Sequence, residues 1–570
     1  MSKARLWILL FIAIGFGAAV GFRLFFIQVQ KSAFYKIQAN GIASSQSKTA
    51  TRRGDIFFQD KEGNRYLAAT TKTFLRLFIA PQKIEAGKED SFAGLLSRER
   101  SIPKDMILGR IKKKEDPYER IEERIPLEQK TKLRKIVETL GSGLGIEEYE
   151  DRFYPYESLA SHILGFVGFA GNAKIGLYGV EKYYDDLLAN SQSLARSIER
   201  SVAGLLSLAK DTAQEGQGDG ASIVLTLDVN IQSEAEKSLL ELIERWKSPR
   251  GSIIVMRPHD GAILAMASRP SFDPNQYGDE KDSSVFINPA LQGVFEPGSI
   301  MKPVTIGTGI EAGSVTPETS YVDTGGVERN GYVIHNAGNK SFGKRTVTEI
   351  LTYSINTGAV FVAEKIGAKA FLRSLEEFGF GSKTGIDLPG EVPGDITNLD
   401  GARPVNLATA AFGQGISATS LQLIRGLNVI ADGGFLVTPH VADTLVYANG
   451  KVETPSLPPN RKVVSSQTAA KVTAMLVEAV KSGYSKKAHL AGYAVAGKTG
   501  TAQIPSPSGG YSDQTIHSFV GFVPAYSPAF IVLMKLDEPL GVRFASDSMT
   551  PSFARLAQFL LQYYGIPPSV

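Results

Sequence analysis

A serine and a lysine lie three residues apart in a stretch that reads Glu-Pro-Gly-Ser-Ile-Met-Lys-Pro, residues 296–303. Residues i and i+3 share one face of a helix, so the amine of Lys302 can reach the hydroxyl of Ser299. A serine becomes an effective nucleophile when a neighbouring base takes its proton. The six histidines of the chain all lie elsewhere in the sequence. The spacing therefore indicates a serine whose proton passes to a lysine.

The surroundings of Ser299 separate it from four other serines that precede a lysine at the same spacing. Pro297 and Gly298 interrupt whatever comes before the serine, and residues 300–310 then carry one charge only. A proline inside a helix costs ~3 kcal/mol. Pro303 is tolerated if the helix begins at Ser299 or just before it, because the first four N–H groups have no intrahelical partner. The four other serines are Ser45, Ser101, Ser207 and Ser341.

The charge state of Lys302 decides whether it can act as a base. A lysine in the first helical turn lies at the positive end of the helix dipole, which disfavours its charged form. Apolar surroundings disfavour that form further. Both effects predict a neutral amine, a candidate general base. This motif alone leaves open the alternative that Ser299 caps a buried helix while Lys302 reaches solvent.

A second candidate motif, Ser354-Ile355-Asn356, lies between two helical runs. One interpretation is a helix–helix loop in which Asn356 is an N-cap. The other is a hydroxyl that relays protons beside an amide that binds a substrate carbonyl. The motif alone does not decide between them.

A third motif, Lys498-Thr499-Gly500, lies in a strand-like run with glycines in its interior. Two other copies, at Lys383 and Lys481, lie in a glycine-rich loop and at a helix end. Glycine inside a strand often marks a close approach to the backbone, as when an extended peptide pairs with the strand. Lys498 adds a second positive charge, able to bind a substrate carboxylate or to hold Lys302 neutral.

Strands at both ends of the region after residue 215 enclose a helical middle, which predicts one α+β domain whose sheet is built from both ends. Helical stretches dominate from residue 299 to about 480. The expected strands are Ile223–Leu227, Ser252–Met256, Ala262–Ala267, 492–503, 518–523 and 529–535, and the flanking helices are Ile231–Trp246 and 551–564. The second and third strands read as a hairpin.

The region before residue 215 is polar and mixed. It contains a charged helical stretch at Leu127–Leu140 and strand-like pieces at Asp55–Phe58 and Ile163–Phe169. A polar, glycine-rich break at residues 211–221 marks a loop or a domain joint. A boundary between two domains is therefore expected near residue 215.

An uncharged run opens the chain, from Leu6 to Phe22, after Lys3 and Arg5. At 1.5 Å per residue it spans about 25 Å, slightly less than a hydrocarbon core of ~30 Å. No small-residue cleavage site follows it, so we predict a transmembrane anchor rather than a cleaved signal peptide. The flanking cations place the N-terminus in the cytoplasm, with the rest of the chain outside.

The overall composition excludes several classes of function. The 570 residues carry a formal net charge of +4, which indicates no nucleic-acid surface and no acidic tail. There is no cysteine, which excludes disulfides, thiol catalysis and thiolate metal sites. We expect no metal and no cofactor.

Taken in order, the three motifs form the motif set of the penicillin-binding proteins and serine β-lactamases, and the chain resembles class B penicillin-binding proteins over nearly its whole length. The stretches Phe412–Leu423 and Ser354–Val360 resemble the division-specific, septal branch. Further matching stretches are Arg53–Ile56, Arg152–Pro155, Gly176–Glu181, Thr226–Asp228 with Gln232, Gly413–Ile416 and Ser518–Phe522.

The resemblance implies an α+β fold: a penicillin-binding-protein/serine β-lactamase-like transpeptidase domain with a sheet flanked by helices and a helical subdomain. An elongated mixed α/β N-terminal module and one transmembrane helix precede it. The implied domains are a cytoplasmic tail with anchor at 1–29, a pedestal or dimerisation-type module at 30–215 and the transpeptidase domain at 216–570.

The resemblance also implies a D,D-transpeptidase that cross-links peptidoglycan, with a role for each motif residue. Ser299 is the acylated nucleophile, Lys302 its base, and Ser354, helped by Lys498, the proton relay to the leaving amine. Asn356 positions the stem-peptide backbone. The substrate-binding strand contributes Thr499, Gly500 and Thr501; the two threonines contact the terminal carboxylate, and the N–H groups of Ser299 and Thr501 form the oxyanion hole.

The implied partners are peptidoglycan stem peptides, β-lactams as covalent inhibitors, a membrane glycosyltransferase of the SEDS (shape, elongation, division and sporulation) family and other divisome proteins, with no nucleic acid. The implied location is the bacterial cytoplasmic membrane, crossed once, with the catalytic domain outside. Three alternatives stay open: an elongation-type transpeptidase, a D,D-carboxypeptidase or β-lactamase, and a non-catalytic β-lactam sensor.

Overall fold

The computed structural model describes residues 52–171, 173–190, 219–401, 403–506 and 509–568. Within these ranges no helix is both long enough and apolar enough to span a membrane. The predicted anchor at Leu6–Phe22, the motifs at Ser45 and Ser207 and the predicted domain boundaries at 29/30 and 215/216 all lie outside the described residues. These remain predictions.

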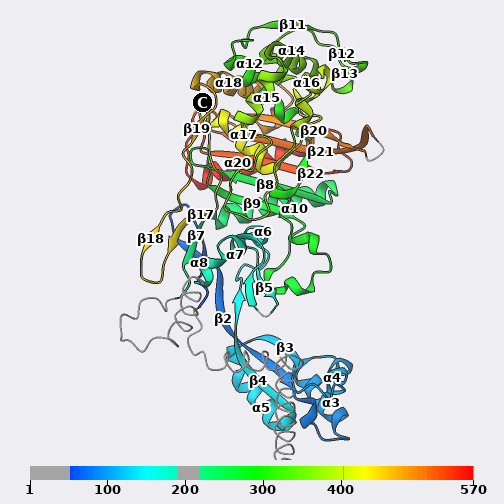
Figure 1. The fold of residues 1–570 in the computed structure, drawn as a ribbon, viewed down its shortest axis with the longest axis vertical. Helices are drawn as coiled ribbons and strands as arrows, with labels where there is room; N and C mark the ends of the chain where they lie inside the picture. The colour runs from blue at the N-terminus through cyan, green and yellow to red at the C-terminus, as the bar shows by residue number, and fades with distance from the viewer. Residues whose placement is uncertain (1–51, 172, 191–218, 402, 507–508, 569–570) are drawn as a thin grey trace, which may run out of the picture. The chain divides into compact units, whose positions relative to one another are not determined.

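A five-stranded antiparallel sheet forms the centre of the C-terminal part, in the order β20-β21-β22-β8-β9. In Figure 1 the green strands β8 and β9 lie beside the orange strands β20 to β22, so the two ends of the domain share one sheet, as predicted. The expected hairpin is confirmed, with Ile253 opposite Ala267. The strands are β8 Arg250–Met256, β9 Ile263–Arg269, β20 Ala496–Pro505, β21 Tyr511–Val523 and β22 Phe530–Asp537.

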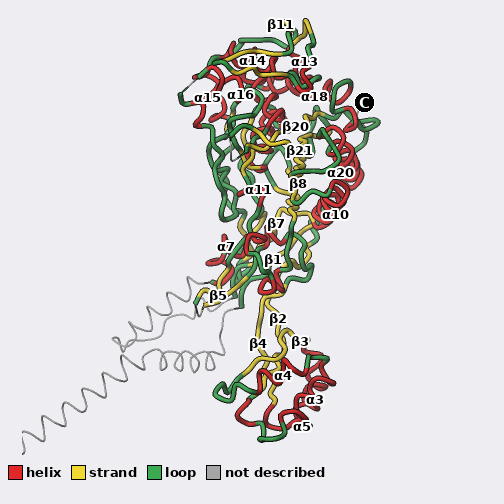
Figure 2. Tube along the Cα trace, turned by 90° about the vertical axis from the view of Figure 1, so that its right-hand side faces the viewer, coloured by secondary structure: helices red, strands yellow, loops and turns green. Residues whose placement is uncertain are grey.

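Two helices cover one face of this sheet, α10 (Val229–Trp246) and α20 (Thr550–Tyr563). Figure 2 shows them together on one side of the strands. Asp228 is the N-cap of α10. Its carboxylate accepts hydrogen bonds from the N–H groups of Asn230 and Ile231, which fixes the start of the helix. Ile231 and Leu239 of α10 and Phe553 of α20 are fully buried against the sheet.

The predicted helical middle covers the opposite face. Every residue of α12 from Lys302 to Ile310 is buried, so this helix is the centre of the domain and its first residue lies in the interior. The helices here are α11 Pro289–Gln292, α12 Lys302–Glu311, α13 Val347–Thr352, α14 Asn356–Ile366, α15 Ala368–Glu377, α16 Pro404–Ala410, α17 Ser420–Ala431 and α18 Ser466–Lys481; α19 Ala545–Ser548 precedes α20.

Four pairs of short strands and several 3₁₀ turns lie among these helices. The pairs are β10 Val294–Phe295 with β15 Ala418–Thr419, β11 Ser320–Asp323 with β14 Gly343–Thr346, β12 Gly326–Arg329 with β13 Tyr332–His335, and β16 Phe435–Leu436 with β19 Arg461–Lys462. The 3₁₀ turns of the chain are η2 Pro81–Lys83, η3 Leu127–Gln129, η4 Gly141–Gly143, η5 Pro274–Asp279, η6 Ser283–Phe286, η7 Gly298–Met301, η8 Ala337–Asn339, η9 Thr397–Leu399 and η10 Lys486–Ala488.

A second sheet, in the order β18-β17-β7-β1-β2-β3 with β4 also paired to β2, links the N-terminal region to the domain. β7, the strand expected at Ile223–Leu227, pairs parallel with β1 and antiparallel with β17. The strands of this second sheet are β1 Ile56–Gln59, β2 Arg65–Ile79, β3 Glu119–Pro126, β4 Leu144–Phe153, β7 Ser222–Asp228, β17 Ala442–Val446 and β18 Val452–Glu453. The N-terminal helices are α3 Glu89–Arg100, α4 Lys104–Ile111, α5 Lys130–Leu140, α6 Ser161–Leu164, α7 Gly179–Tyr183 and α8 Asp185–Ala189.

Two of the three N-terminal predictions are confirmed and one is wrong in part. The strand near Asp55–Phe58 is β1, and the charged helical stretch is η3 followed by α5. The expected strand at Ile163–Phe169 instead begins as the end of α6 and becomes β5 (Val167–Ala170), paired with β6 (Ala173–Gly176). Gly165 separates the two with φ +69°, and a Cβ there would lie 1.8 Å from the Tyr178 carbonyl oxygen, so the chain turns at this glycine.

A buried ion cluster joins three of the N-terminal stretches that were singled out in the sequence. The fully buried Glu181 carboxylate accepts from Arg53 Nε at 2.7 Å and from Arg152 Nε at 2.6 Å. Burial opposes ionisation of Glu181, but the two guanidinium groups outweigh it and hold the pKa of the carboxyl below its usual value. The cluster fixes β1, β4 and α7 to one another.

Glu181→Ala is expected to lower the free energy of unfolding by about 3–5 kcal/mol, because it leaves the buried Arg152 guanidinium without its carboxylate and leaves Arg53 with the carboxylate of Asp185 alone. A urea titration of the full chain followed by circular dichroism measures this. The matched control is Glu377→Ala, which removes an exposed pair on α15 (Arg373 Nε to Glu377 Oε1, 3.2 Å) and should cost no more than about 0.5 kcal/mol. Equal effects of the two changes would contradict the prediction.

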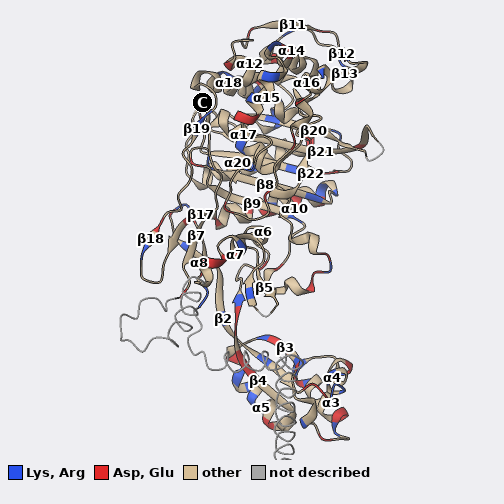
Figure 3. Ribbon diagram, in the orientation of Figure 1, with Lys and Arg blue, Asp and Glu red and all other residues tan. Residues whose placement is uncertain are grey.

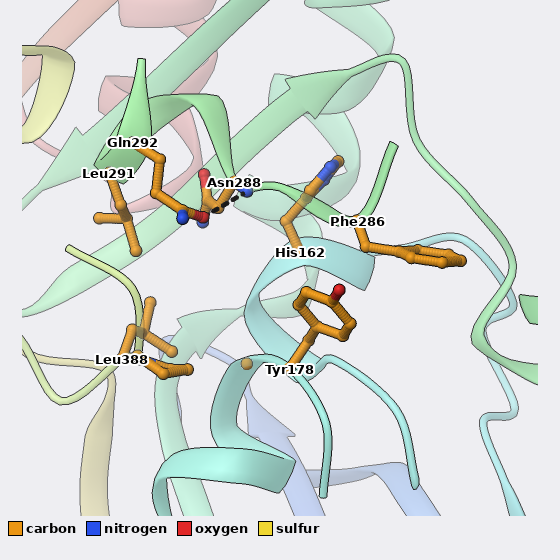
Figure 4. Close-up of a pocket in the computed structure, with 9 residues that line it drawn as sticks. His162, Tyr178, Phe286, Asn288, Leu291, Gln292 and Leu388 are labelled. Atoms are coloured by element: carbon orange, nitrogen blue, oxygen red, sulfur yellow. Dashed lines mark hydrogen bonds between the residues drawn. The ribbon is translucent and has the colours of Figure 1, made fainter. Parts of the chain in front are cut away.

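A small cavity lies where α6 and the loop before α7 meet α11 (Figure 4). Its volume of about 20 Å³ is room for roughly one water molecule. His162 and Tyr178 line one side, and Asn288 and Gln292, joined by a hydrogen bond of 3.2 Å, line the other. The cavity is too small for a peptide or nucleotide.

Candidate active site

Ser299 lies in the 3₁₀ turn η7, and the α-helix α12 begins at Lys302. The predicted helix start is therefore displaced: the helical turn begins at Gly298, but the α-helical ladder begins three residues after Ser299. Pro303 has no N–H that could donate to the Ser299 carbonyl. The Lys302 N–H donates to that carbonyl instead, which makes the turn a 3₁₀ turn. In a 3₁₀ turn residues i and i+3 eclipse each other, which sets Lys302 directly over Ser299.

Three glycines allow the backbone to crowd around this turn. Gly298 has φ +59° and donates its N–H to the Gly413 carbonyl at 2.9 Å. A Cβ on Gly413 would lie 2.3 Å from the Gly298 carbonyl oxygen. On the other side, a Cβ on Gly500 would lie 2.9 Å from Ile300 Cγ1 and 2.4 Å from Ser518 Oγ. The turn that carries Ser299 is thus held between strand β20 and the Gly413 loop.

Gly500→Ala is expected to slow acylation of Ser299 about 100-fold, the usual cost of a displacement of ~1 Å at a reacting centre. The added methyl group must push β20 away from the Ser299 turn, since its nearest neighbours are closer than van der Waals contact. Stopped-flow acylation by a chromogenic β-lactam measures the rate. Gly278→Ala, where the new Cβ meets nothing within 4 Å, is the control; a Gly500→Ala rate equal to that of the control would refute the crowding argument.

The Lys302 amine is fully buried and has four oxygen atoms around it. Nζ lies 3.0 Å from Ser299 Oγ and 3.1 Å from Ser354 Oγ. It also donates to the Ser354 carbonyl oxygen at 2.6 Å and to Asn356 Oδ1 at 2.8 Å. The last two are acceptors only, so they take the two hydrogens of a neutral amine, and the lone pair then faces the two hydroxyl groups.

Lys498 provides the second charge of the site. It is 1% exposed, and its Nζ donates to Ser354 Oγ at 2.9 Å and to the Thr499 carbonyl at 3.1 Å. Burial lowers the pKa of Lys498 to about 7. Burial, with the repulsion of Lys498 second, lowers the pKa of Lys302 well below its usual value. Lys302 therefore gives up its proton first, and Ser354 Oγ connects the two amines.

Ser354 and Asn356 occupy a tight loop between α13 and α14. Ser354 has φ +55°, a conformation that turns its hydroxyl and its carbonyl toward Lys302. Asn356 is the first residue of α14 and not its N-cap, so the N-cap interpretation of this motif is wrong. Its Nδ2 donates to the His335 carbonyl at 2.9 Å, which orients Oδ1 toward Lys302.

A buried polar network holds this loop, and the sequence analysis missed it. The Asp323 carboxylate accepts from Asn336 Nδ2 and from Thr357 Oγ1, at 3.0 and 2.6 Å. Asn336 follows His335 and Thr357 follows Asn356, so the network fixes the two residues that share the Asn356–His335 hydrogen bond. The three residues lie up to 34 positions apart, and no local pattern in the sequence links them.

Strand β20 is an edge strand of the five-stranded sheet and carries Thr499, Gly500 and Thr501. Its edge opposite β21 pairs with no other strand and has the hydrogen-bonding groups that an extended peptide needs. Thr501 Oγ1 accepts from the Ala545 N–H at 3.0 Å, so the first turn of α19 holds this threonine. Across the described parts of the chain, no group of three or more histidine, aspartate or glutamate residues could hold a metal ion.

Two family models match adjacent parts of the sequence. "Penicillin-binding Protein dimerisation domain" matches residues 48–225, and "Penicillin binding protein transpeptidase domain" matches residues 251–558. The chain belongs to the class B penicillin-binding proteins. The predicted α+β fold, with an N-terminal module before the transpeptidase domain, and the predicted class of enzyme, a penicillin-binding transpeptidase, are confirmed.

Several known proteins are similar to this penicillin-binding protein over most of their own length. Stage V sporulation protein D of Bacillus subtilis is 30% identical over 100% of this chain and 87% of the relative. The probable peptidoglycan D,D-transpeptidase PenA of Neisseria meningitidis is 27% identical over 100% and 94%. Penicillin-binding protein 3 of Mycobacterium tuberculosis, solved with aztreonam, is 26% identical with a TM-score of 0.69, over 92% of this chain and 98% of that one.

The structure of this penicillin-binding protein brings together five of the residues selected from the sequence: Ser299, Lys302, Ser354, Asn356 and Lys498. Gly500 lies against the nucleophile turn, and Thr499 and Thr501 flank it on the same strand. Lys383 and Lys481, the other copies of the third motif, take no part in the hydrogen bonds that join these five residues.

Proposed function

We propose that this penicillin-binding protein cross-links peptidoglycan stem peptides through an acyl-enzyme on Ser299. The observation that carries the proposal is the position of Lys302 Nζ, 3.0 Å from Ser299 Oγ and 3.1 Å from Ser354 Oγ. The neutral amine takes the Ser299 proton as Oγ attacks the carbonyl carbon of the penultimate D-Ala. Burial first, and the repulsion of a protonated Lys498 second, keep Lys302 neutral.

The proton then reaches the leaving group through Ser354. The amine of the terminal D-Ala takes a proton from Ser354 Oγ, which is replaced from Lys302, with Lys498 holding the hydroxyl at 2.9 Å. In the second half-reaction an amine of another stem peptide attacks the Ser299 ester and the protons return by the same route. β-Lactams imitate the donor, and their acyl adduct stays on Ser299.

The substrate strand is proposed to pair with the edge of β20 that faces away from β21. Thr499 and Thr501 contact its terminal carboxylate, Gly500 permits its close approach, and Asn356 binds a backbone carbonyl. The N–H groups of Ser299 and Thr501 form the oxyanion hole, in which each donor typically contributes about 3–4 kcal/mol to the transition state.

The proposed setting is the septal machinery of a bacterial cytoplasmic membrane. The support is the predicted anchor at Leu6–Phe22 and the resemblance of Phe412–Leu423 to the division-specific branch. The module before the transpeptidase domain is a dimerisation-type domain, so glycan polymerisation needs a partner, for which we propose a SEDS-family glycosyltransferase within the divisome. Figure 3 shows lysine and arginine mixed with aspartate and glutamate along the described elements. We propose no nucleic-acid partner.

Two experiments test this proposal. Purified protein incubated with uncross-linked peptidoglycan should yield dimeric muropeptides by mass spectrometry; monomers shortened by one D-Ala would indicate a carboxypeptidase instead. A fluorescent fusion should collect at midcell in dividing cells. A fusion distributed along the side wall would favour the elongation-type alternative.

A further inference from the structure

An aromatic patch lies beside the loop that carries Ser354. We define it as the rings of Phe342, Tyr353 and Tyr484 together with the cations Lys340 and Arg345. Phe342 stacks on Tyr353 with centroids 6.0 Å apart, and Tyr353 meets Tyr484 edge-on at 6.3 Å. The Lys340 amine lies 5.8 Å from the Tyr484 ring, and the Arg345 guanidinium lies 5.5 Å from the Tyr353 ring.

The aromatic patch is attached to the active site on two sides. Tyr353 directly precedes Ser354, and the Tyr484 N–H donates to the carbonyl of Thr352 at 3.2 Å. On the other side, Asn336 Nδ2 donates to the Lys340 carbonyl at 3.0 Å, and the neighbouring His335 carbonyl accepts from Asn356. Both ends of the patch are therefore fixed within two residues of Ser354 or His335, which contact Lys302 and Asn356 respectively.

The exposure and charge of the aromatic patch suit an acidic peptide. Tyr484 is 41% exposed, and Phe342 and Tyr353 are partly exposed, so the rings are not simply part of the core. Glu349 accepts from Arg345 at 2.6 Å, whereas Lys340 makes no ion pair with any described residue. Exposed rings give apolar contact to the stem of a ligand side chain, and a cation beside them can donate to a carboxylate.

The chemistry of the second half-reaction places the amine of the acceptor beside Ser354. The leaving amine receives its proton from Ser354, and by microscopic reversibility the attacking amine returns a proton to the same hydroxyl. The amine nitrogen bonds to the acyl carbon, the ester bond to Ser299 Oγ breaks, and the amine proton passes through Ser354 and Lys302 to Ser299 Oγ. The amine of the acceptor must therefore lie next to Ser354, one residue from Tyr353 of the patch.

We infer that the aromatic patch is the subsite for the acceptor stem peptide, an acidic peptide that bears a free amine. The inference rests on the proposed transpeptidase mechanism. It commits to a peptide: the rings hold the aliphatic part of the amine-bearing side chain, and Lys340 binds a carboxylate. Neither group touches the donor, so changes here should separate the two half-reactions.

The test measures both half-reactions on the full chain. Acylation is followed with a fluorescent penicillin, and aminolysis with a D-alanyl thioester donor plus a synthetic stem peptide as acceptor. Tyr484→Ala and Lys340→Ala should each raise the KM for the acceptor about tenfold, with the acylation rate unchanged within about twofold. Tyr484→Phe keeps the ring and should match the wild type, as should Tyr526→Ala, a more exposed tyrosine (65%) of the same domain.

Each other outcome has a separate meaning. Unchanged acceptor KM in both variants would overturn the inference while leaving the proposed function intact. Failure of the wild type to acylate or to transfer to any amine would instead overturn the proposed function. If Lys340→Ala raises the KM equally for the stem peptide and for its carboxyl-amidated form, Lys340 does not bind a carboxylate. Competition by a peptide-free disaccharide, lost in Tyr484→Ala, would show a glycan site and overturn the peptide assignment.

Discussion

Ser299→Ala is expected to abolish the covalent adduct that the wild-type protein forms with a fluorescent penicillin. The hydroxyl lies 3.0 Å from Lys302 Nζ, and the turn that carries it packs against the edge strand β20. Removing a nucleophile of this kind costs at least about three orders of magnitude in rate, because the residual binding groups cannot replace bond formation. In-gel fluorescence after brief exposure to the label measures the loss, with an intact thermal unfolding transition as the check on folding.

The matched control for Ser299→Ala is Ser101→Ala, which removes an exposed serine that also precedes a lysine by three residues. It should label like the wild type. An adduct that persists in Ser299→Ala and maps to Ser354 would show that the other hydroxyl facing Lys302 is the nucleophile. Rapid loss of the label from the wild type would indicate a β-lactamase.

The central sheet and the helices around it could be predicted because their signals are local. Apolar runs bounded by turn residues marked β8, β9 and β22, and helical spacing marked α10 and α20. The short strand pairs β11–β14 and β12–β13 could not be predicted in this way. Each of their strands has four residues, too few for an alternating pattern, and their pairing depends on buried groups such as Asp323.

The site could be predicted as a set of residues but not as a network. The ordered motifs identified Ser299, Lys302, Ser354 and Lys498, whose types alone suggest acid–base chemistry. The hydrogen bond from Asn356 to the His335 carbonyl joins residues 21 positions apart, and a backbone acceptor leaves no trace in the residue types. The 3₁₀ start of α12 was missed for a related reason, since Pro303 permits both an α-helical and a 3₁₀ turn before it.

The rate of acylation is expected to depend on pH through two lysines with opposite requirements. Lys302 must be neutral to take the Ser299 proton, so the rate rises as pH passes the lowered pKa of Lys302. Lys498 must stay protonated, so the rate falls again near its pKa of about 7. The profile should therefore be bell-shaped, and its two limbs belong to the coupled pair.

Replacing Lys498 by methionine separates these two contributions. The positive charge of Lys498 adds to burial in lowering the pKa of Lys302, so its removal raises that pKa and moves the acid limb of the profile to higher pH. The alkaline limb disappears, because Lys498 no longer titrates. The maximal rate falls by about two to four orders of magnitude, as for other acid–base groups. Lys383→Met, which replaces the exposed lysine of another Lys-Thr-Gly copy, should leave both limbs in place. An acid limb that stays fixed in Lys498→Met would mean that burial alone keeps Lys302 neutral, and an alkaline limb that persists would assign it to another group.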